Sequence, residues 1–137
     1  MTAEAKKALA VLLIEDNGAD AFLTKEILHD STVPVTVHVV QDAAKAFAHM
    51  LSGGVMTPDL ILIDLNSPAM DGFAFLTGMA KEERLKYIPV FILSASSERA
   101  DIEKAMYLGA RGYFTKPLDP DRFEMEMQKL LKPAEQN

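Results

Sequence analysis

The sequence has no cysteine, and its apolar runs are all short. Without cysteine, neither a disulfide framework nor a thiolate metal site can form. No apolar run approaches the roughly 20 residues that a membrane-spanning helix needs, so no membrane span is predicted. Basic residues are also few, with 14 Lys and Arg against 20 Asp and Glu, and they form no stripe that would favour nucleic acid.

The N-terminal segment resembles a secretory signal only in outline. Lys6 and Lys7 precede an apolar stretch over residues 8–14, but this stretch ends at Glu15 and Asp16 without a small-residue cleavage site. The stretch is therefore interpreted as the first strand of the fold. Together with the missing cysteine, this favours a soluble, cytoplasmic protein.

What the chain does contain is an alternation of short apolar runs and longer amphipathic ones. The 137 residues, 49% hydrophobic and 25% charged, are typical of one globular domain, with a core over about 8–132. The alternation indicates five strand–helix units, which predicts an α/β fold around a parallel sheet. Periodicity leaves the order of the strands in that sheet open.

The expected elements can be delimited from apolar spacing and from capping residues. The predicted strands cover residues 8–14, 35–40, 59–63, 90–93 and 112–114, and the predicted helices cover 18–29, 42–52, 72–83 and 98–108. A last helix is predicted to begin at Pro120 and to include Leu131. Predicted N-caps are Asp42, Ser97 and Asp119, whereas Gly53 and Gly109 are expected to end helices.

The same spacing predicts which helix side chains face inward. The inward sets are Phe22, Leu23 and Ile27 in the first helix; Ala44, Phe47, Ala48 and Leu51 in the second; Ile102, Ala105 and Met106 in the fourth; and Phe123, Met127, Leu130 and Leu131 in the last. Each set is a prediction about packing alone.

Charged residues follow three of the apolar runs directly. The first run ends in Glu15 and Asp16, the run over 60–63 ends in Asp64, and the run over 112–115 ends in Lys116. Continuous apolar runs suit strands that are buried on both faces of a parallel sheet, and ligands bind beyond the carboxyl ends of such strands. If these strands are neighbours, one sheet edge carries three acids and a base.

Three carboxylates in one pocket repel each other, by on the order of 4 kcal/mol for two charges about 4 Å apart. A cluster of this kind persists by raising a pKa or by binding a cation. With oxygen ligands only, the natural ion is Mg²⁺, and Mn²⁺ suits the same geometry. The alternative is that Asp16 and Asp64 merely cap the helices or turns that follow them.

These residues carry a resemblance to the receiver domain of two-component response regulators. It is based on Glu15-Asp16-Asn17, the segment 64–68 with Asp71-Gly72, Ser94-Ala95 and Lys116-Pro117, and it spans nearly the whole chain. The spacing is specific, with 30 residues from Asp64 to Ser94 and 22 from Ser94 to Lys116. The opening motif over 15–20 is further similar to small single-domain regulators that partner bacterial and cyanobacterial phytochromes.

The resemblance implies a flavodoxin-like, doubly wound five-stranded parallel sheet of order 2-1-3-4-5. It implies that Asp64 accepts a phosphoryl group from a histidine kinase or a phosphotransfer protein. Asp16, Asp64, the backbone carbonyl of Asn66 and, largely through water, Glu15 would hold Mg²⁺, while Lys116 and Ser94 would bind the phosphoryl group.

The resemblance also implies how the protein would signal. Ser94 would move toward the phosphoryl group, and Tyr113 would swing into the space that Ser94 vacates. Output would come from partner binding, phosphorelay or a homodimer through the fourth helix, the fifth strand and the last helix. A cis peptide between Lys116 and Pro117 is expected as well.

Two other functions fit parts of the pattern. An aspartyl-phosphate-forming phosphatase would use Asp64 in the same way, but Asn66 stands where many such hydrolases carry a general acid, so we expect a signalling protein and not an enzyme. A flavodoxin-like cofactor binder shares the fold, but Glu15 and Asp16 would repel a phosphate at the first loop.

Overall fold

The structure, a computed structural model, describes residues 8–53, 57–65, 71–95 and 98–131. Five strands form one parallel sheet in the order β2-β1-β3-β4-β5. The strands are β1 (Leu9–Ile14), β2 (Val35–Val40), β3 (Leu60–Asp64), β4 (Val90–Ser94) and β5 (Gly112–Thr115). The helices are α1 (Gly18–Asp30), α2 (Ala43–Ser52), α3 (Gly72–Lys81), α4 (Arg99–Tyr107) and α5 (Pro120–Leu131). The predicted fold class and strand order are confirmed.

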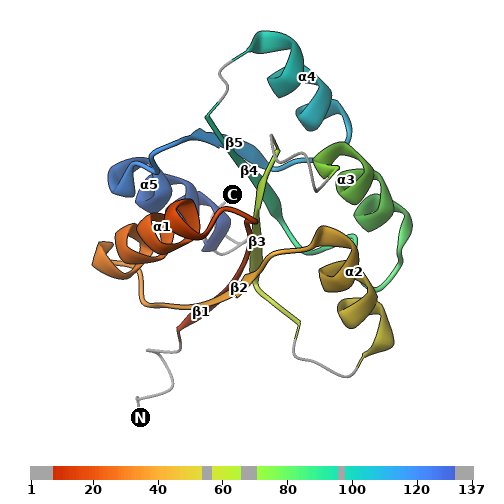
Figure 1. Cartoon of the computed structure of the whole chain (residues 1–137), viewed down its shortest axis with the longest axis horizontal. Helices are drawn as coiled ribbons and strands as arrows, with labels where there is room; N and C mark the ends of the chain where they lie inside the picture. Colours follow the sequence, from red (N-terminus) through yellow and green to blue (C-terminus); the bar gives the residue numbers. More distant parts are fainter. Residues whose placement is uncertain (1–7, 54–56, 66–70, 96–97, 132–137) are drawn as a thin grey trace.

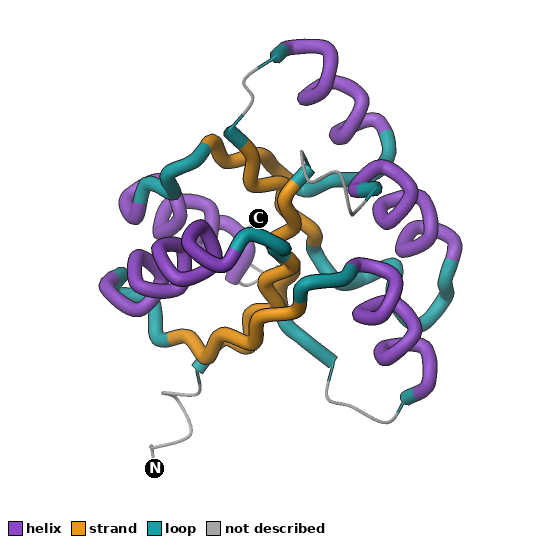
Figure 2. The backbone as a smooth tube through the Cα atoms, in the orientation of Figure 1, coloured by secondary structure: helices purple, strands orange, loops and turns teal. Residues whose placement is uncertain are grey.

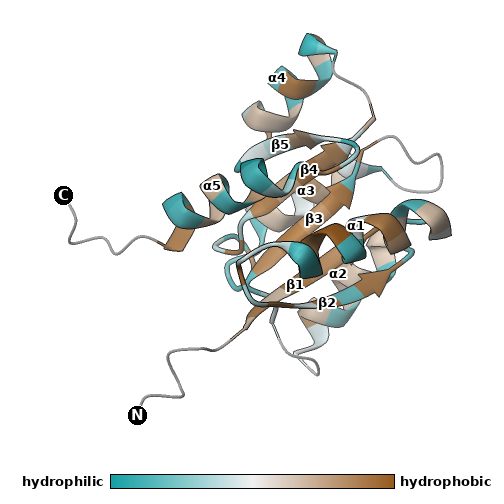
Figure 3. Ribbon diagram, turned by 90° about the vertical axis from the view of Figure 1, so that its left-hand side faces the viewer, coloured by the Kyte–Doolittle hydropathy of each residue, from teal (hydrophilic) through white to brown (hydrophobic). Residues whose placement is uncertain are grey.

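The helices cover both faces of the sheet. Figure 1 and Figure 2 show α1 and α5 on one side of the strands and α2, α3 and α4 on the other. Figure 3 shows that the strands are largely hydrophobic, whereas hydrophilic residues occur mainly on the helices around them. This is the arrangement of a doubly wound sheet with its helices on both faces.

Two hydrophobic cores, one on each face, hold these layers together. Alternate strand residues point to opposite faces, so Leu13 of β1 packs under α1 and α5, whereas Ile14 packs toward α2 and α3. The central strands β1, β3 and β4 are buried along almost their whole length. Burial on both faces explains why their sequences are continuously apolar and not alternating.

Polar side chains cap the starts of four helices. Asn17, Asp42 and Asp71 each accept a hydrogen bond from a backbone N–H in the first turn of α1, α2 and α3. Asp119 likewise accepts from the backbone N–H of Asp121 in α5. The predicted caps at residues 42 and 119 are therefore confirmed. Ser97 lies outside the described residues, and the N-cap position of α4 is Glu98, so the predicted cap of this helix is wrong.

The predicted inward face of α1 is wrong at two of its three positions, since only Ile27 packs against the core. Phe22 is 66% exposed and Leu23 is 48% exposed, and the buried positions are Ala21, Thr24 and Leu28. Small side chains at two of these three positions allow the backbone of α1 to lie close to the sheet. The larger apolar side chains therefore point into solvent.

Smaller errors of the same kind occur elsewhere. In α2 the buried positions are Ala43, Ala46 and Met50, so Ala44 and Ala48 are exposed, although Phe47 and Leu51 do pack against the core. Met106 of α4 and Leu131 of α5 are also exposed. Ala105 and Met127, which belong to the same predicted inward sets, are buried as expected. Apolar spacing alone did not decide which of two adjacent helix faces meets the sheet.

No helix among the described residues combines the length and the apolar character that crossing a bilayer would require.

Candidate functional site

The three acids that end the first and third strands meet at one edge of the sheet. Strand β1 pairs with β3, with Ile14 opposite Ile63, so Glu15 and Asp16 emerge beside Asp64. One carboxylate oxygen from each of the three residues lies within 4.8 Å of the other two. The predicted convergence of these residues is confirmed.

These acids are not the helix caps. The capping oxygen of α1 belongs to Asn17 and that of α3 belongs to Asp71. The simpler interpretation of Asp16 and Asp64 as the caps of these helices is thus excluded. The Asp64 side chain is 9% exposed, so the carboxylate is buried but not closed off from solvent.

Lys116 reaches the acids from the edge strand β5. Its Nζ lies 2.7 Å from Glu15 Oε1, 2.8 Å from Asp20 Oδ2 and 3.3 Å from Asp64 Oδ2. Its backbone N–H donates to the carbonyl of Ser94 at 2.8 Å, which holds the start of the loop after β5 against the end of β4. The peptide between Lys116 and Pro117 is cis, as expected.

Glu15 is the most deeply buried acid of the group, with a side chain that is fully buried. Burial raises the pKa of Glu15 to about 6; the nearby Lys116 opposes this shift and Asp64 adds to it. Lys116 shows the complementary effect. Burial tends to lower its pKa, but the neighbouring carboxylates of Asp20, Glu15 and Asp64 outweigh burial, and the pKa of Lys116 is raised.

The donor set fits a divalent cation. Although Glu15 Oε1 lies close to the ammonium of Lys116, the contact lacks hydrogen-bond geometry, and this buried oxygen has no hydrogen-bond partner. Three carboxylate oxygens, one each from Glu15, Asp16 and Asp64, lie within 4.8 Å of one another, and a cation bound among them would offset their mutual repulsion. Hard oxygen ligands of this kind suit Mg²⁺ and Mn²⁺.

We expect the metal-free protein to lose stability as the pH rises through the range from about 4.5 to 6. The pKa of Glu15 is higher in the folded protein than in the unfolded chain, so the folded state binds more protons in this window. Ionising Glu15 should therefore lower the free energy of unfolding by about 2 kcal/mol. Urea denaturation in EDTA at pH 4.5 and pH 7 measures the difference.

The matched control is Glu15→Gln, which keeps the shape of the side chain and removes the titration. This variant should lose that part of the pH dependence, and saturating Mg²⁺ should restore stability to the wild type at pH 7. A wild type and a Glu15→Gln variant with the same pH dependence would contradict the assigned burial of the charge.

The remaining predicted site residues differ in how the structure places them. Ser94 ends β4, next to Asp64 on β3, and is fully buried. Tyr113 lies on β5 with 8% exposure and packs in the core that includes Ile92 and Ala105. Asn66, predicted to lend its carbonyl to the metal, lies outside the described residues.

Sequence reasoning missed one member of the cluster. Asp20 lies in the first turn of α1, 96 residues from Lys116 along the chain, and its Oδ2 accepts a hydrogen bond from Lys116 Nζ. The position alone indicates an acid that favours the N-terminus of a helix, which needs no further role. Asp20 ends the motif over 15–20 that carries part of the family resemblance, but that motif assigned it no role in the site.

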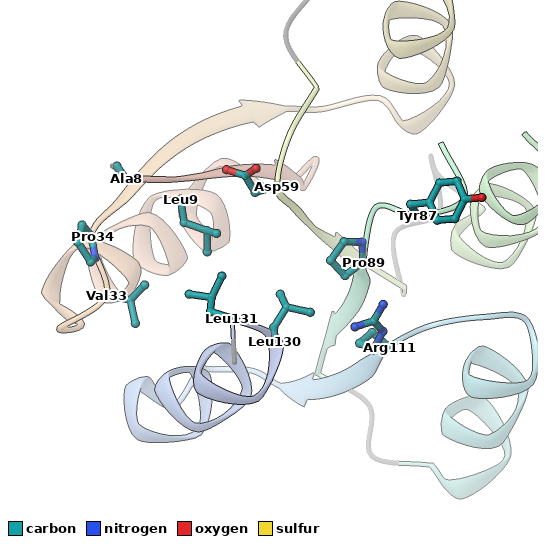
Figure 4. A pocket seen from close by; sticks show the side chains of 10 residues that line it. All are labelled: Ala8, Leu9, Val33, Pro34, Asp59, Tyr87, Pro89, Arg111, Leu130 and Leu131. Carbon is teal, nitrogen blue, oxygen red and sulfur yellow. The ribbon is translucent and has the colours of Figure 1, made fainter. Parts of the chain in front are cut away.

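A groove of about 550 Å³ lies far from the acids. Figure 4 shows its lining, in which residues that precede the strands, such as Pro34, Asp59 and Arg111, face Leu130 and Leu131 at the end of α5. Since the strands are parallel, this groove lies at the amino ends of the strands, whereas Asp64 lies at their carboxyl ends. It takes no part in the chemistry of the acidic cluster.

Comparison with known proteins gives one consistent result. The family model of the response regulator receiver domain matches residues 11–128. Response regulator Rcp1 of Synechocystis sp. is 33% identical over 130 residues, which cover 91% of this chain and 88% of that protein. The chemotaxis protein CheY of Pseudomonas aeruginosa is 27% identical over 124 residues, which cover 90% of this chain and 97% of that protein.

Solved structures agree with the sequence comparison. The phosphorylated cyanobacterial phytochrome response regulator RcpA matches with a TM-score of 0.77 and 34% identity, covering 93% of this chain and 98% of that chain. The Mn²⁺-bound form of response regulator Rcp1 matches with a TM-score of 0.73 and 30% identity, covering 92% of this chain and 96% of that chain.

Proposed function

This chain belongs to the response regulator receiver domain family, and from that premise we propose that it accepts a phosphoryl group on Asp64 and signals through the resulting change in conformation. One observation carries the proposal. Asp64 is one of three clustered carboxylates suited to a divalent cation, and the ammonium of Lys116 lies 3.3 Å from its Oδ2. Cations on two sides of a carboxylate are what phosphoryl transfer to that carboxylate requires.

In the proposed reaction, a carboxylate oxygen of Asp64 attacks the phosphorus of a phosphohistidine. The new O–P bond forms as the P–N bond breaks, and its electron pair remains on the imidazole nitrogen. Lys116 supplies positive charge to the phosphoryl oxygens, and the Ser94 hydroxyl donates to the same group. Burial of Asp64 and Ser94 limits competing water at the reacting carboxylate.

The proposed cofactor is Mg²⁺, held by Asp16, Asp64 and the carbonyl of Asn66, with Glu15 close behind them. When bound, it would neutralise charge on the phosphoryl group during transfer. Two observations support it, the convergence of the carboxylates of Glu15, Asp16 and Asp64 and the Mn²⁺ in the similar Rcp1 structure. Mn²⁺ is therefore the natural substitute in experiments.

The proposed phosphodonor is a histidine kinase or a phosphotransfer protein of the cytoplasm. The similarity to Rcp1 and to the phytochrome response regulator RcpA makes a phytochrome-type kinase the first donor to test. Phosphotransfer from such a kinase should be faster than from an unrelated histidine kinase at equal concentration. Equal rates from both kinases would contradict this choice of donor.

The proposed output surface comprises α4, β5 and α5. Exposed apolar side chains on both of these helices support it, namely Met106, Tyr107 and Met125, and β5 is an edge strand. We expect Ser94 and the buried ring of Tyr113 to couple the phosphoryl group to this surface. A homodimer is expected there. Size-exclusion chromatography with light scattering would contradict the dimer by showing only monomer with and without a phosphate mimic.

The test of the proposed function is incubation with acetyl phosphate and Mg²⁺, followed by intact-mass measurement. We expect the wild type to gain one phosphoryl group and to gain none when EDTA removes the metal. No gain in the presence of Mg²⁺ would contradict the proposal. Rapid, saturable hydrolysis of small phosphate esters would instead favour the phosphatase alternative.

A further inference from the structure

Lys116 is shared among carboxylates from three different elements of the fold. Glu15 follows β1, Asp64 ends β3, and Asp20 lies on α1. The distance from Nζ to Asp20 is 2.8 Å, shorter than the 3.3 Å to Asp64, the proposed phosphoacceptor. The ammonium is therefore held more closely by a helix residue than by the residue on which it is expected to act.

The partners of the ammonium differ sharply in their exposure to solvent. The side chain of Glu15 is 0% exposed and that of Asp20 is 44% exposed, so Lys116 lies between a buried acid and a solvent-facing one. Glu15 would leave a buried charge uncompensated if the ammonium departed, which is costly. Asp20 would be rehydrated by water, so losing this contact costs little.

An ammonium group has three N–H donors, and three carboxylates lie within ion-pair distance of it among the described residues. A phosphoryl group on Asp64 adds a further anionic acceptor on the side of Lys116. The ammonium must turn at least one donor toward it. Because Asp20 is the partner that is released at the lowest cost, it is the one expected to be exchanged.

We propose that Asp20 is a positioning residue that holds Lys116 in the unphosphorylated site and competes with the phosphoryl group for its ammonium. This inference rests on the proposed function. Asp20 would thereby weaken the affinity of the site for the phosphoryl group, and its charge would set how readily the protein leaves its resting state.

The test is the affinity of the Mg²⁺-saturated protein for beryllofluoride, a mimic of the phosphoryl group, measured from the bound ¹⁹F NMR signal. Asp20→Asn removes the competing charge with little change in shape. We expect this variant to bind beryllofluoride about two- to fivefold more tightly than the wild type, the range of a partly exposed ion pair. Equal or weaker binding would overturn the inference.

Three controls separate this effect from general ones. Asp121→Asn removes a first-turn acid from α5, which begins at the same sheet edge, and Asp121 forms no ion pair with Lys116. It should leave the affinity unchanged. Asp20→Glu keeps the charge and should behave like the wild type. In a Lys116→Met background, Asp20→Asn should no longer tighten binding, because the ammonium is gone.

The outcomes also separate this inference from the proposed function. If the wild type neither binds beryllofluoride nor gains a phosphoryl group from acetyl phosphate, the proposed function fails. If the wild type does both, but Asp20→Asn and Asp121→Asn change the affinity equally, only the role of Asp20 fails, since the effect would then be one of net charge.

Discussion

The Asp64→Asn variant is expected to gain no phosphoryl group from acetyl phosphate and Mg²⁺ under conditions in which the wild type gains one. The amide keeps the size of the side chain but is a poor nucleophile and does not carry the negative charge that a cation binds. Intact-mass measurement after the same incubation reads the result directly. We expect the loss to be complete within the sensitivity of the measurement.

The Asp64→Asn variant is expected to fold, so unfolding would not account for its failure to be phosphorylated. Asp64 contributes to raising the pKa of Glu15, so neutralising Asp64 should leave the metal-free protein as stable as the wild type or more stable. Urea denaturation in EDTA checks this. The matched control is Asp42→Asn, because Asn caps a helix as well as Asp does. This control should be phosphorylated fully. A phosphorylated Asp64→Asn protein would remove Asp64 from the proposal.

The second large effect is expected from Lys116→Met, which retains the apolar stem of the side chain and removes the charge. Loss of one group that stabilises developing charge typically costs about 10² to 10³ in rate, and we expect that loss in the initial rate of phosphorylation by acetyl phosphate. Rapid-quench sampling with intact-mass analysis measures this rate at saturating Mg²⁺.

The same variant should change the pH dependence of metal binding. Lys116 lowers the pKa of Glu15, so without the ammonium this pKa should rise above its wild-type value of about 6. Mg²⁺ must then compete with a proton up to a higher pH. Titrations of Mg²⁺ between pH 5 and pH 8 should show this difference. As the pH is lowered, the Mg²⁺ affinity of Lys116→Met should begin to fall at a higher pH than the Mg²⁺ affinity of the wild type.

The control for Lys116→Met is Lys129→Met on α5. Lys129 is largely exposed and pairs only loosely with Glu126, at 3.7 Å. Exposed ion pairs contribute little to stability, so this variant should keep the wild-type rate of phosphorylation and the wild-type pH dependence. A similar rate loss in both variants would show that net charge, and not the position of Lys116, determines the rate.

Much of this site could be predicted because its residues follow directly from buried strands. Glu15, Asp16 and Asp64 each come after an apolar run, and the carboxyl ends of parallel strands meet at one edge of the sheet. The cluster could therefore be predicted from the sequence. The pairing of β1 with β3 was needed to bring these ends together, and it was expected from the family resemblance and not from periodicity.

The helix faces show where prediction from apolar spacing failed. Phe22 and Leu23 are large and apolar, which favoured them as core residues, but α1 packs through Ala21, Thr24 and Leu28. The sheet surface beneath α1 is already filled by strand side chains and by Phe123 of α5. Small residues on α1 fit that surface. The shape of the surface depends on residues of other elements, so it could not be predicted from the sequence of α1 alone.

The amino-acid sequence by itself determined the alternation of strands and helices and the carboxylates placed after two of the central strands, because both are properties of neighbouring residues. Only the tertiary structure decided that Asp20 shares the ammonium of Lys116, and that Glu15 is buried deeply enough for its pKa to rise to about 6. Asp20 and Lys116 are 96 residues apart in the chain, so their contact forms only when the chain folds. The exclusion of water from Glu15 likewise depends on the packing of the folded chain.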